Sequence, residues 1–140
     1  MLGILNETHP AENLITAGQP TLEQIQAAAA AGVKTIITLR PDSELGDRDE
    51  RAEVEAAGMA YVSIPISGPG DLNAANAQAL AEALSDDGTT LVHCGSSNRV
   101  GALLAVKAAV IDGQGTEDAI SLGKAAGLTS MEPMVRQALS

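Results

Sequence analysis

The sequence has 140 residues, 45% of them hydrophobic, and a formal net charge of -10. This length predicts one domain over residues 1–140, with an aliphatic core because Tyr61 is the only aromatic residue. The acidic balance argues against a nucleic-acid-binding face and against adsorption to anionic membranes, since both require clustered positive charge. A single cysteine excludes an internal disulfide and fits a reducing compartment. Without a signal-peptide pattern or an apolar run of about 20 residues, we expect a cytoplasmic protein that does not contact a membrane.

Strand-like and helix-like patterns alternate along the chain after a loose N-terminal segment that carries an exposed His9. Thr21 and Gln24 have the spacing of a capping box. The run 33–40 is β-branched and almost continuously apolar, which is typical of a buried parallel strand. The charged run 42–55 predicts a solvated helix face. In chain order we expect a strand in 13–20, a helix in 21–31, a strand at 33–40, a helix in 42–58, a strand at 59–66, a helix in 72–85, a turn at 86–88, a strand at 89–93, a helix in 99–111, a helix capped by Thr116, and a short last helix capped by Thr129 or Ser130.

This alternation predicts βαβ units, and therefore an α/β fold with a central, mostly parallel sheet of four to five strands and helices on both faces. Ligands of such folds bind beyond the carboxyl ends of the strands. Arg40, the loop 67–71 and the loop after the strand 89–93 all lie at such ends. Three separate segments are therefore expected to meet at one rim of the sheet.

The loop after the strand 89–93 begins with Cys94 and ends with Arg99. Amides at the start of the following helix have no partner within the helix and can face an anion, while the helix dipole adds about half a positive charge there. The planar fork of Arg99 matches an oxyanion, and this environment favours the thiolate form of Cys94. The pattern predicts an oxyanion cup with a nucleophile, against the alternative that Cys94 is a small buried hydrophobic residue.

The stretch "HCGSSNRVGA", residues 93–102, resembles the signature loop of cysteine-dependent phosphatases. Residues 15–44 and 60–69 resemble the phosphatase-like domain of the β-lactamase-hydrolase-like proteins, and the likeness extends over about residues 10–112. It is most specific at Gly18-Gln19-Pro20, at Leu39-Arg40-Pro41 and at 93–99. The resemblance implies a dual-specificity-phosphatase-like fold, with Cys94 as nucleophile and Arg99 as phosphate clamp. The phosphate-binding loop would then consist of Gly95, Ser96, Ser97, Asn98 and Arg99.

Three features differ from the usual phosphatase loop. Four residues rather than five separate Cys94 from Arg99, a spacing similar to that of many single-domain rhodaneses. The mid-loop glycine is absent and Ser97 stands near its place, so a positive φ is expected at Gly95 or Asn98 instead. Val100 follows Arg99, where the usual loop has a serine or threonine whose hydroxyl helps the thiolate to leave.

Three further residues are candidates for the site. Asp71 is the general acid by resemblance, because similar phosphatases keep an aspartic acid in the loop after the third strand; its alternative role is a turn residue or helix cap. Arg40 is expected to orient the substrate or to hold the loop through a carboxylate such as Glu44, against the alternative of a solvated strand end. His93 should point away from Cys94 and hydrogen-bond into the loop. No ligand spacing predicts a metal, and no cofactor is expected.

These features favour a cysteine-dependent phosphatase of phosphomonoesters, phosphoproteins included, that acts through a phosphocysteine on Cys94. A rhodanese-like sulfurtransferase that carries a persulfide on Cys94 remains an alternative. A non-catalytic pseudophosphatase that binds an anion or a phosphopeptide is the other. The expected partner is a phosphorylated substrate or another small oxyanion, and the pattern does not define the substrate or the oligomeric state.

Overall fold

The computed structural model describes residues 2–44, 46, 48–84, 88–95 and 97–140. Five strands form one sheet in the order β1-β2-β5-β3-β4, with β1 antiparallel to β2 and the other neighbours parallel. This arrangement confirms the expected α/β fold with a mostly parallel sheet. The strands are β1 (Thr8–Ala11), β2 (Leu14–Ala17), β3 (Val33–Thr38), β4 (Ala60–Ser63) and β5 (Thr89–His93). The helices are α1 (Leu22–Ala30), α2 (Glu50–Ala56), α3 (Ala74–Leu84), α4 (Asn98–Val110), α5 (Thr116–Ala125) and α6 (Glu132–Ala138), with short 3-10 turns η1 (Asp42–Glu44) and η2 (Pro69–Asp71).

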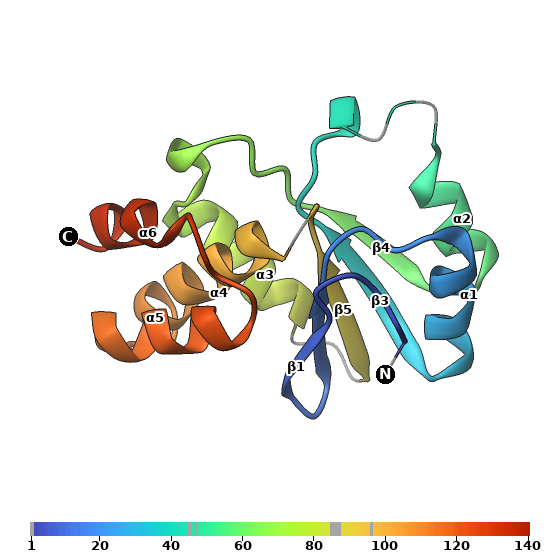
Figure 1. The fold of residues 1–140 in the computed structure, drawn as a ribbon, viewed down its shortest axis with the longest axis horizontal. Helices are drawn as coiled ribbons and strands as arrows, with labels where there is room; N and C mark the ends of the chain where they lie inside the picture. The colour runs from blue at the N-terminus through green and yellow to red at the C-terminus, as the bar shows by residue number, and fades with distance from the viewer. Residues whose placement is uncertain (1, 45, 47, 85–87, 96) are drawn as a thin grey trace.

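Helices cover both faces of the sheet. Figure 1 shows α1 and α2 on one side of the strands and α3 to α6 on the other. Adjacent residues on a strand point to opposite faces, so Ile36 and Leu91 enter the core under α1 and α2, while Ile37 and Val92 enter the core under α3 to α6. Each central strand is thus apolar on both faces, which explains the continuous apolar run in its sequence.

Several element boundaries differ from the sequence-based expectation. Residues 8–11 are not loose but form β1, which pairs with β2 in a hairpin. The expectation of a single helix over 42–58 is wrong, because the structure has η1 and then α2 there. Asp49 accepts a hydrogen bond from the amide of Ala52 and so starts α2 as a separate helix. The expected turn at 86–88 lies mostly outside the described residues.

The helix caps were predicted with mixed success. The capping box of Thr21 and Gln24 is confirmed. Thr116 is the first residue of α5 rather than its cap, a position that Gly115 takes in an extended conformation. Met131, rather than Thr129 or Ser130, precedes α6. In the described part of the chain, no helix has both the length and the apolar character needed to cross a membrane.

Candidate active site

The carboxyl ends of β2, β3 and β5 meet where the loop with Cys94 begins. The amide of Cys94 donates to the carbonyl of Ala17, and the amide of Leu39 donates to the carbonyl of His93. At Gly18 two backbone segments approach each other so closely that an added Cβ atom would lie 2.6 Å from the carbonyl oxygen of Gly95. Glycine is therefore required at Gly18 for the loop to rest against β2. The stretch Gly18-Gln19-Pro20, which the resemblance singled out, therefore supports the stretch that contains Cys94 and Gly95.

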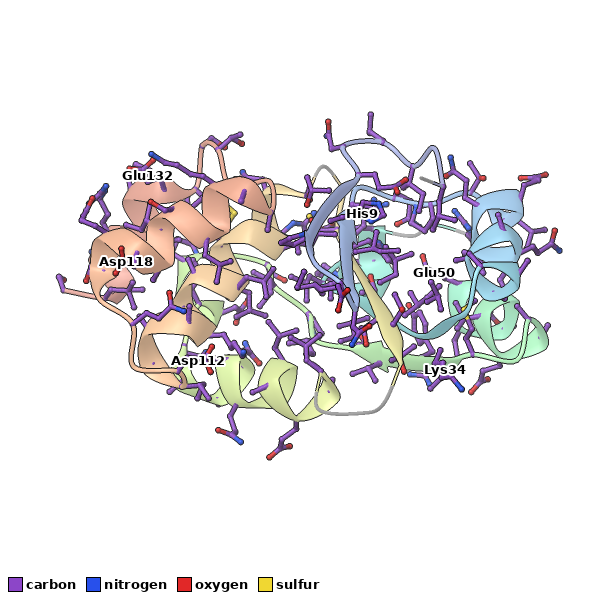
Figure 2. All side chains as sticks on the ribbon, turned by 90° about the horizontal axis from the view of Figure 1, so that it is seen from below. His9, Lys34, Glu50, Asp112, Asp118 and Glu132 are labelled. Carbon is purple, nitrogen blue, oxygen red and sulfur yellow. The ribbon has the colours of Figure 1, made fainter. Side chains whose placement is uncertain are left out.

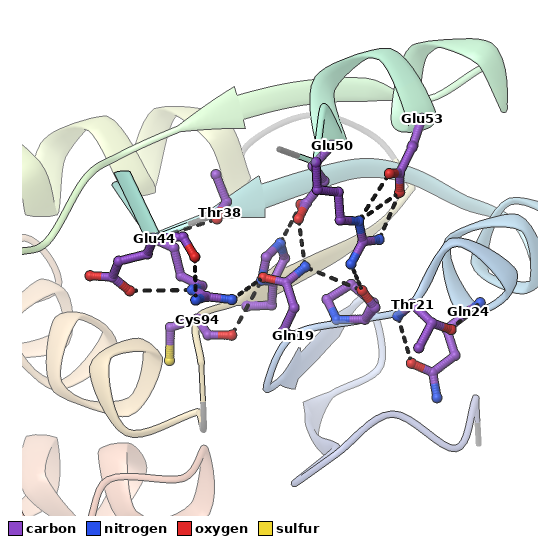
Figure 3. A network of polar contacts seen from close by, with 12 residues as sticks. Gln19, Thr21, Gln24, Thr38, Glu44, Glu50, Glu53 and Cys94 are labelled. Carbon is purple, nitrogen blue, oxygen red and sulfur yellow. Dashed lines mark hydrogen bonds and ion pairs between the residues drawn. The ribbon is translucent and has the colours of Figure 1, made fainter. Parts of the chain in front are cut away.

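Cys94 lies beneath the surface and is 1% exposed. Its side chain belongs to the core on the α4 face, as does the fully buried Val100 in the first turn of α4. In Figure 3 the sulfur of Cys94 points away from the polar network behind it. Neighbouring groups therefore cover almost the whole surface of Cys94.

The loop turns into α4 through Ser97, which has a left-handed φ of 76°. The expectation of a positive φ at Gly95 or Asn98 is wrong, because Ser97 itself adopts the conformation that glycine would supply. Its hydroxyl donates to the carbonyl of Ala126 over 2.9 Å, and the side chain is fully buried. The contact with residues 126–127 stabilises this costly backbone conformation from outside the loop. Ser96 lies outside the described residues.

Asn98 holds the segment that joins α5 to α6. Its Oδ1 accepts hydrogen bonds from the amides of Thr129 and Met131, and its Nδ2 donates to the hydroxyl of Ser130. The side chain of Asn98 is therefore engaged away from an oxyanion, so the contribution expected of this residue has to come from its amide. Gly101 in α4 donates to the carbonyl of Ser97, and the amides before Gly101 begin the helix.

Arg99 is oriented by two acceptors. Its Nη1 donates to Glu44 Oε2 and to the carbonyl oxygen of Ile66, both over 3.0 Å, and its Nη2 donates to Glu44 Oε1 over 2.7 Å. A guanidinium carries five N–H groups, so these described contacts leave the Nε–H and one Nη2–H, which share one edge. A Cβ atom added to Gly95 would lie 3.7 Å from Nη2. The remaining edge of Arg99 therefore lies close to the loop and suits two oxygens of one oxyanion.

Glu44 joins two arginines at this rim. Besides Arg99, its carboxylate accepts from Arg40 Nε over 3.2 Å, and Arg40 Nη2 donates to the backbone carbonyl of Glu44. The hydrogen bonds from Arg99 and Arg40 hold the pKa of Glu44 below its usual value. The pairing with Glu44 in turn raises the pKa of Arg99. The contact between Arg40 and Glu44 that the sequence suggested is present.

A chain of hydrogen bonds continues from Arg40 to the residue before Cys94 (Figure 3). Arg40 Nη1 donates to Gln19 Oε1 over 2.8 Å, and Gln19 Nε2 donates to Glu50 Oε1 over 2.6 Å. The other carboxylate oxygen of Glu50 lies 2.5 Å from His93 Nε2. Gln19 thus links an arginine at the rim to a carboxylate in the interior.

Glu50 and His93 are both buried, with exposures of 1% and 0%. Figure 2 shows Glu50 inside the molecule, whereas the exposed Asp118 lies at its periphery. Burial by itself would raise the pKa of Glu50, but the hydrogen bond and charge of His93, with help from Gln19 and the charge of Arg48, lower it overall. As expected, His93 points away from Cys94, and its Nδ1 lies 3.4 Å from the Cys94 carbonyl oxygen.

Asp71 lies in η2 and shapes its own loop. Its Oδ2 accepts a hydrogen bond from the amide of Ser67 over 2.8 Å, so it is a turn residue. It does not cap α3, because the side chain of Asn73 accepts from the amide of Asn76 at the start of that helix. No described contact joins Asp71 to Arg99 or Cys94. A general-acid role therefore stays a prediction.

A cleft of about 400 Å³ opens beside Arg99. Its described lining combines polar residues of the site with apolar residues of the 66–69 loop and the start of α6. Cys94 is not among the described lining residues of this cleft. In the described part of the chain, no group of three His, Cys, Asp or Glu side chains is placed to bind a metal. The lining residues are Glu44, Ile66, Ser67, Gly68, Pro69, Asn98, Arg99, Met131 and Met134.

Sequence reasoning missed the roles of Gln19 and Glu50. Gln19 stands within one of the specific stretches of the resemblance, which was a usable signal. Glu50 had none, because it lies among eight other charged residues in the run 42–55 that predicted a solvated face. Its burial corrects that prediction.

The sheet, its two layers of helices and the loop from Cys94 to Arg99 together define a cysteine-phosphatase-like domain. Tk-PTP in its active form superposes with a TM-score of 0.73 at 17% identity, covering 96% of this chain and 95% of that one. A cysteine-to-serine variant of TpbA from P. aeruginosa, in complex with phosphotyrosine, superposes with a TM-score of 0.70 at 18% identity, covering 96% and 83% of the two chains. At these identities the likeness shows the fold.

The chain belongs to the family of the beta-lactamase hydrolase-like protein, phosphatase-like domain, whose model matches residues 9–111. A beta-lactamase hydrolase-like protein of Xylella fastidiosa is 37% identical over 122 residues, which are 83% of this chain and 28% of that protein. One from Agrobacterium fabrum is 36% identical over 93 residues, or 63% and 21% of the two. The chain thus spans about a quarter of the length of these relatives. The family suggested by the sequence is confirmed.

Proposed function

We propose that this domain hydrolyses phosphomonoesters with Cys94 as nucleophile and Arg99 as the clamp for the phosphoryl oxygens. The observation that carries the proposal is the edge of Arg99 that no described contact engages, which adjoins Gly95 directly after Cys94. The other edge is fixed by Glu44, so the guanidinium is already oriented before a substrate binds. Pre-oriented donors stabilise charge in a transition state without further reorganisation.

The reaction would proceed in two steps. The Cys94 thiolate forms an S–P bond as the P–O bond to the leaving group breaks, and the leaving oxygen takes a proton, which we assign to Asp71. Water then attacks phosphorus and gives a proton to the Asp71 carboxylate, the S–P bond breaks, and inorganic phosphate leaves as the thiolate is restored. The loop amides from Gly95 to Asn98 and the side edge of Arg99 hold the phosphoryl oxygens in both steps.

A second candidate function is transfer of sulfane sulfur. Val100 places no hydroxyl next to Arg99, and the Ser97 hydroxyl donates to Ala126, so in the described part of the loop neither supports the departure of a thiolate from phosphorus. Sulfur transfer does not include that step: Cys94 forms an S–S bond with the outer sulfur of thiosulfate as sulfite leaves, and an acceptor thiolate then takes that sulfur.

The test compares the wild type with Cys94→Ser in two assays on one preparation. We expect nitrophenyl phosphate hydrolysis that disappears in Cys94→Ser, and slower turnover of thiosulfate with a thiol acceptor. Thiosulfate turnover far above phosphatase turnover would favour the second function. Phosphate binding without Cys94-dependent turnover in either assay would leave an anion-binding domain.

A further inference from the structure

The cleft beside Arg99 has a lining of two chemical kinds. Glu44, Asn98 and Arg99 are polar and belong to the network around the phosphate-binding loop. Met131 and Met134 come from the start of α6 and are joined by apolar residues of the loop after β4. A volume of about 400 Å³ is in the range of sites for small organic groups. The cleft therefore has room for an organic group beside Arg99.

The charges of the lining limit what can bind there. Arg99 is the only cation among the described lining residues, and one of its edges is already engaged by Glu44. One oxyanion can use the free edge. A second anionic group on the same ligand would find no cation in the described lining and would approach the carboxylate of Glu44. The lining favours a ligand with a single anionic head.

The two methionines suit an aromatic group. Both side chains are half-buried and pack against the core of the α4 face. A thioether is flexible and polarisable, and its contacts with aromatic rings are favourable. The chain has no Phe or Trp, and its one tyrosine, Tyr61, packs in the other core, so no aromatic side chain is among the described lining residues.

The wall is also tied to the phosphate-binding loop. The amide of Met131 donates to the side chain of Asn98 over 3.3 Å, and Asn98 directly precedes Arg99. The start of α6 therefore has a fixed place relative to the phosphate clamp. Such a fixed distance between an anion-binding site and an apolar wall selects ligands by shape as well as by charge.

We infer that Met131 and Met134 are specificity-determining residues, which hold an aromatic group of the substrate while Arg99 holds its single phosphoryl head. The inference rests on the proposed function and adds the class of ester: an aryl phosphate or a close analogue without a second negative charge.

Methionine NMR tests this directly in the wild-type protein. The protein is labelled with methyl-13C methionine, and its signals are assigned with Met→Leu variants. The probes are 2-naphthylmethylphosphonate and methylphosphonate, which share a head group that cannot be hydrolysed. With one aromatic residue in the chain, ring-current shifts report the ligand's ring. We expect shifts at Met131 and Met134 with the naphthyl compound only. Met59, which is 5% exposed in the other core, is the internal control and should not shift.

Substitutions give a second readout. Met131→Gln together with Met134→Gln should raise the Kd of the naphthyl compound roughly 5- to 30-fold and leave that of methylphosphonate unchanged, because only apolar contact is removed. Leu22→Gln, which removes an exposed apolar side chain of α1, should change neither. Phosphonomethylphenylalanine, free and within a short peptide, distinguishes the sources of the aromatic group: tighter binding of the peptide assigns a protein side chain, and equal binding assigns a small ester.

The outcomes separate the two claims. If methylphosphonate binds and the naphthyl compound binds no more tightly, or binds without shifting the two methyl signals, the specificity inference is overturned and the proposed function stands. If neither phosphonate binds, the proposed phosphate site fails and the inference fails with it.

Discussion

Glu50 Oε2 lies 2.5 Å from Nε2 of His93, and both side chains are removed from solvent. The pair joins α2 to the last residue of β5, one residue before Cys94. Because the same carboxylate also accepts from Gln19, the pair continues to Arg40 and the rim of the site. The position of the proposed phosphate-binding loop therefore depends on a buried carboxylate in α2, a helix on the opposite face of the sheet from α4.

The first prediction concerns Glu50→Gln. Gln keeps only one acceptor oxygen where Glu50 uses two, so the buried contact with either His93 or Gln19 is lost, and we expect a loss of about 2–4 kcal/mol in the free energy of unfolding. Because the folded-state pKa of Glu50 is lowered, its stabilisation is fully present above the usual value of 4.5 and is lost as the pH falls through the lowered pKa. The difference between wild type and variant in urea unfolding should therefore shrink at acid pH.

The matched control for this prediction is Glu117→Gln. Glu117 forms an exposed pair with Arg136, and exposed pairs contribute little, so its loss should leave the unfolding midpoint near that of the wild type. Equal midpoints for the two variants, or a constant difference between wild type and Glu50→Gln down to the most acid pH, would contradict the role given to Glu50.

The second prediction concerns Glu44→Gln. Gln keeps the shape of the side chain but loses the charge that orients Arg99, so we expect the affinity for inorganic phosphate to fall roughly 3- to 30-fold by calorimetry. Glu55→Gln, on an exposed part of α2, is the control and should bind phosphate like the wild type. A rise in affinity would mean that Glu44 competes with the oxyanion for Arg99 instead of positioning it.

The sequence was informative where a pattern has one physical cause. The apolar run 33–40 identified a strand buried on both faces, and the order of strand, Cys94, small residues, Arg99 and helix identified the loop. The three stretches that resembled the family meet at the ends of β2, β3 and β5. Local spacing was sufficient there because each stretch carries its own geometric requirement, as Gly18 does beneath Gly95.

Other features depend on contacts between distant parts of the chain. Glu50 reads as a surface residue until His93, 43 positions later, is placed against it. Ser97 adopts a positive φ because Ala126, 29 residues away, accepts its hydroxyl. Gly115 and Met131 take the cap positions of α5 and α6 without a side-chain hydrogen bond to the helix. Capping rules identify side chains that form such a bond, so they pointed to Thr116, Thr129 and Ser130 instead.

The third prediction compares Gly127→Ala with Gly113→Ala. Both glycines have a positive φ, so both substitutions introduce backbone strain of about 1 kcal/mol. A Cβ atom at Gly113 meets nothing within 4 Å, whereas at Gly127 it would lie 2.6 Å from the Ser97 side chain. Gly127→Ala should therefore lower the free energy of unfolding by about 1–3 kcal/mol more than Gly113→Ala does. Of the two variants, only Gly127→Ala should weaken phosphate binding. Indistinguishable stability and binding in thermal unfolding and calorimetry would show that the segment after α5 does not support the loop.

The fourth prediction concerns Asp71→Asn. If Asp71 protonates the leaving oxygen, the variant should lose roughly 10²- to 10⁴-fold in kcat with alkyl phosphates, which have poor leaving groups, and much less with nitrophenyl phosphate. Asn retains an acceptor for the amide of Ser67, so the loop should keep its shape. Small and equal losses with both substrates would leave Asp71 as a turn residue only.

The last prediction starts from Val100, which is fully buried in the first turn of α4 directly after Arg99. Breakdown of a phosphocysteine expels the Cys94 thiolate, and the nearby Ser97 hydroxyl is engaged with Ala126. We therefore expect a burst of nitrophenol followed by a slower steady state. Val100→Thr keeps the shape and adds one hydrogen-bond donor, so it should raise the steady-state rate roughly 2- to 10-fold and leave the burst unchanged. Val106→Thr, which buries a hydroxyl elsewhere in α4, controls for the loss of stability. The rate of sulfur transfer from thiosulfate should not rise in Val100→Thr, since no S–P bond is broken in that reaction. If Cys94→Ser hydrolyses nitrophenyl phosphate as fast as the wild type, the phosphocysteine intermediate is excluded.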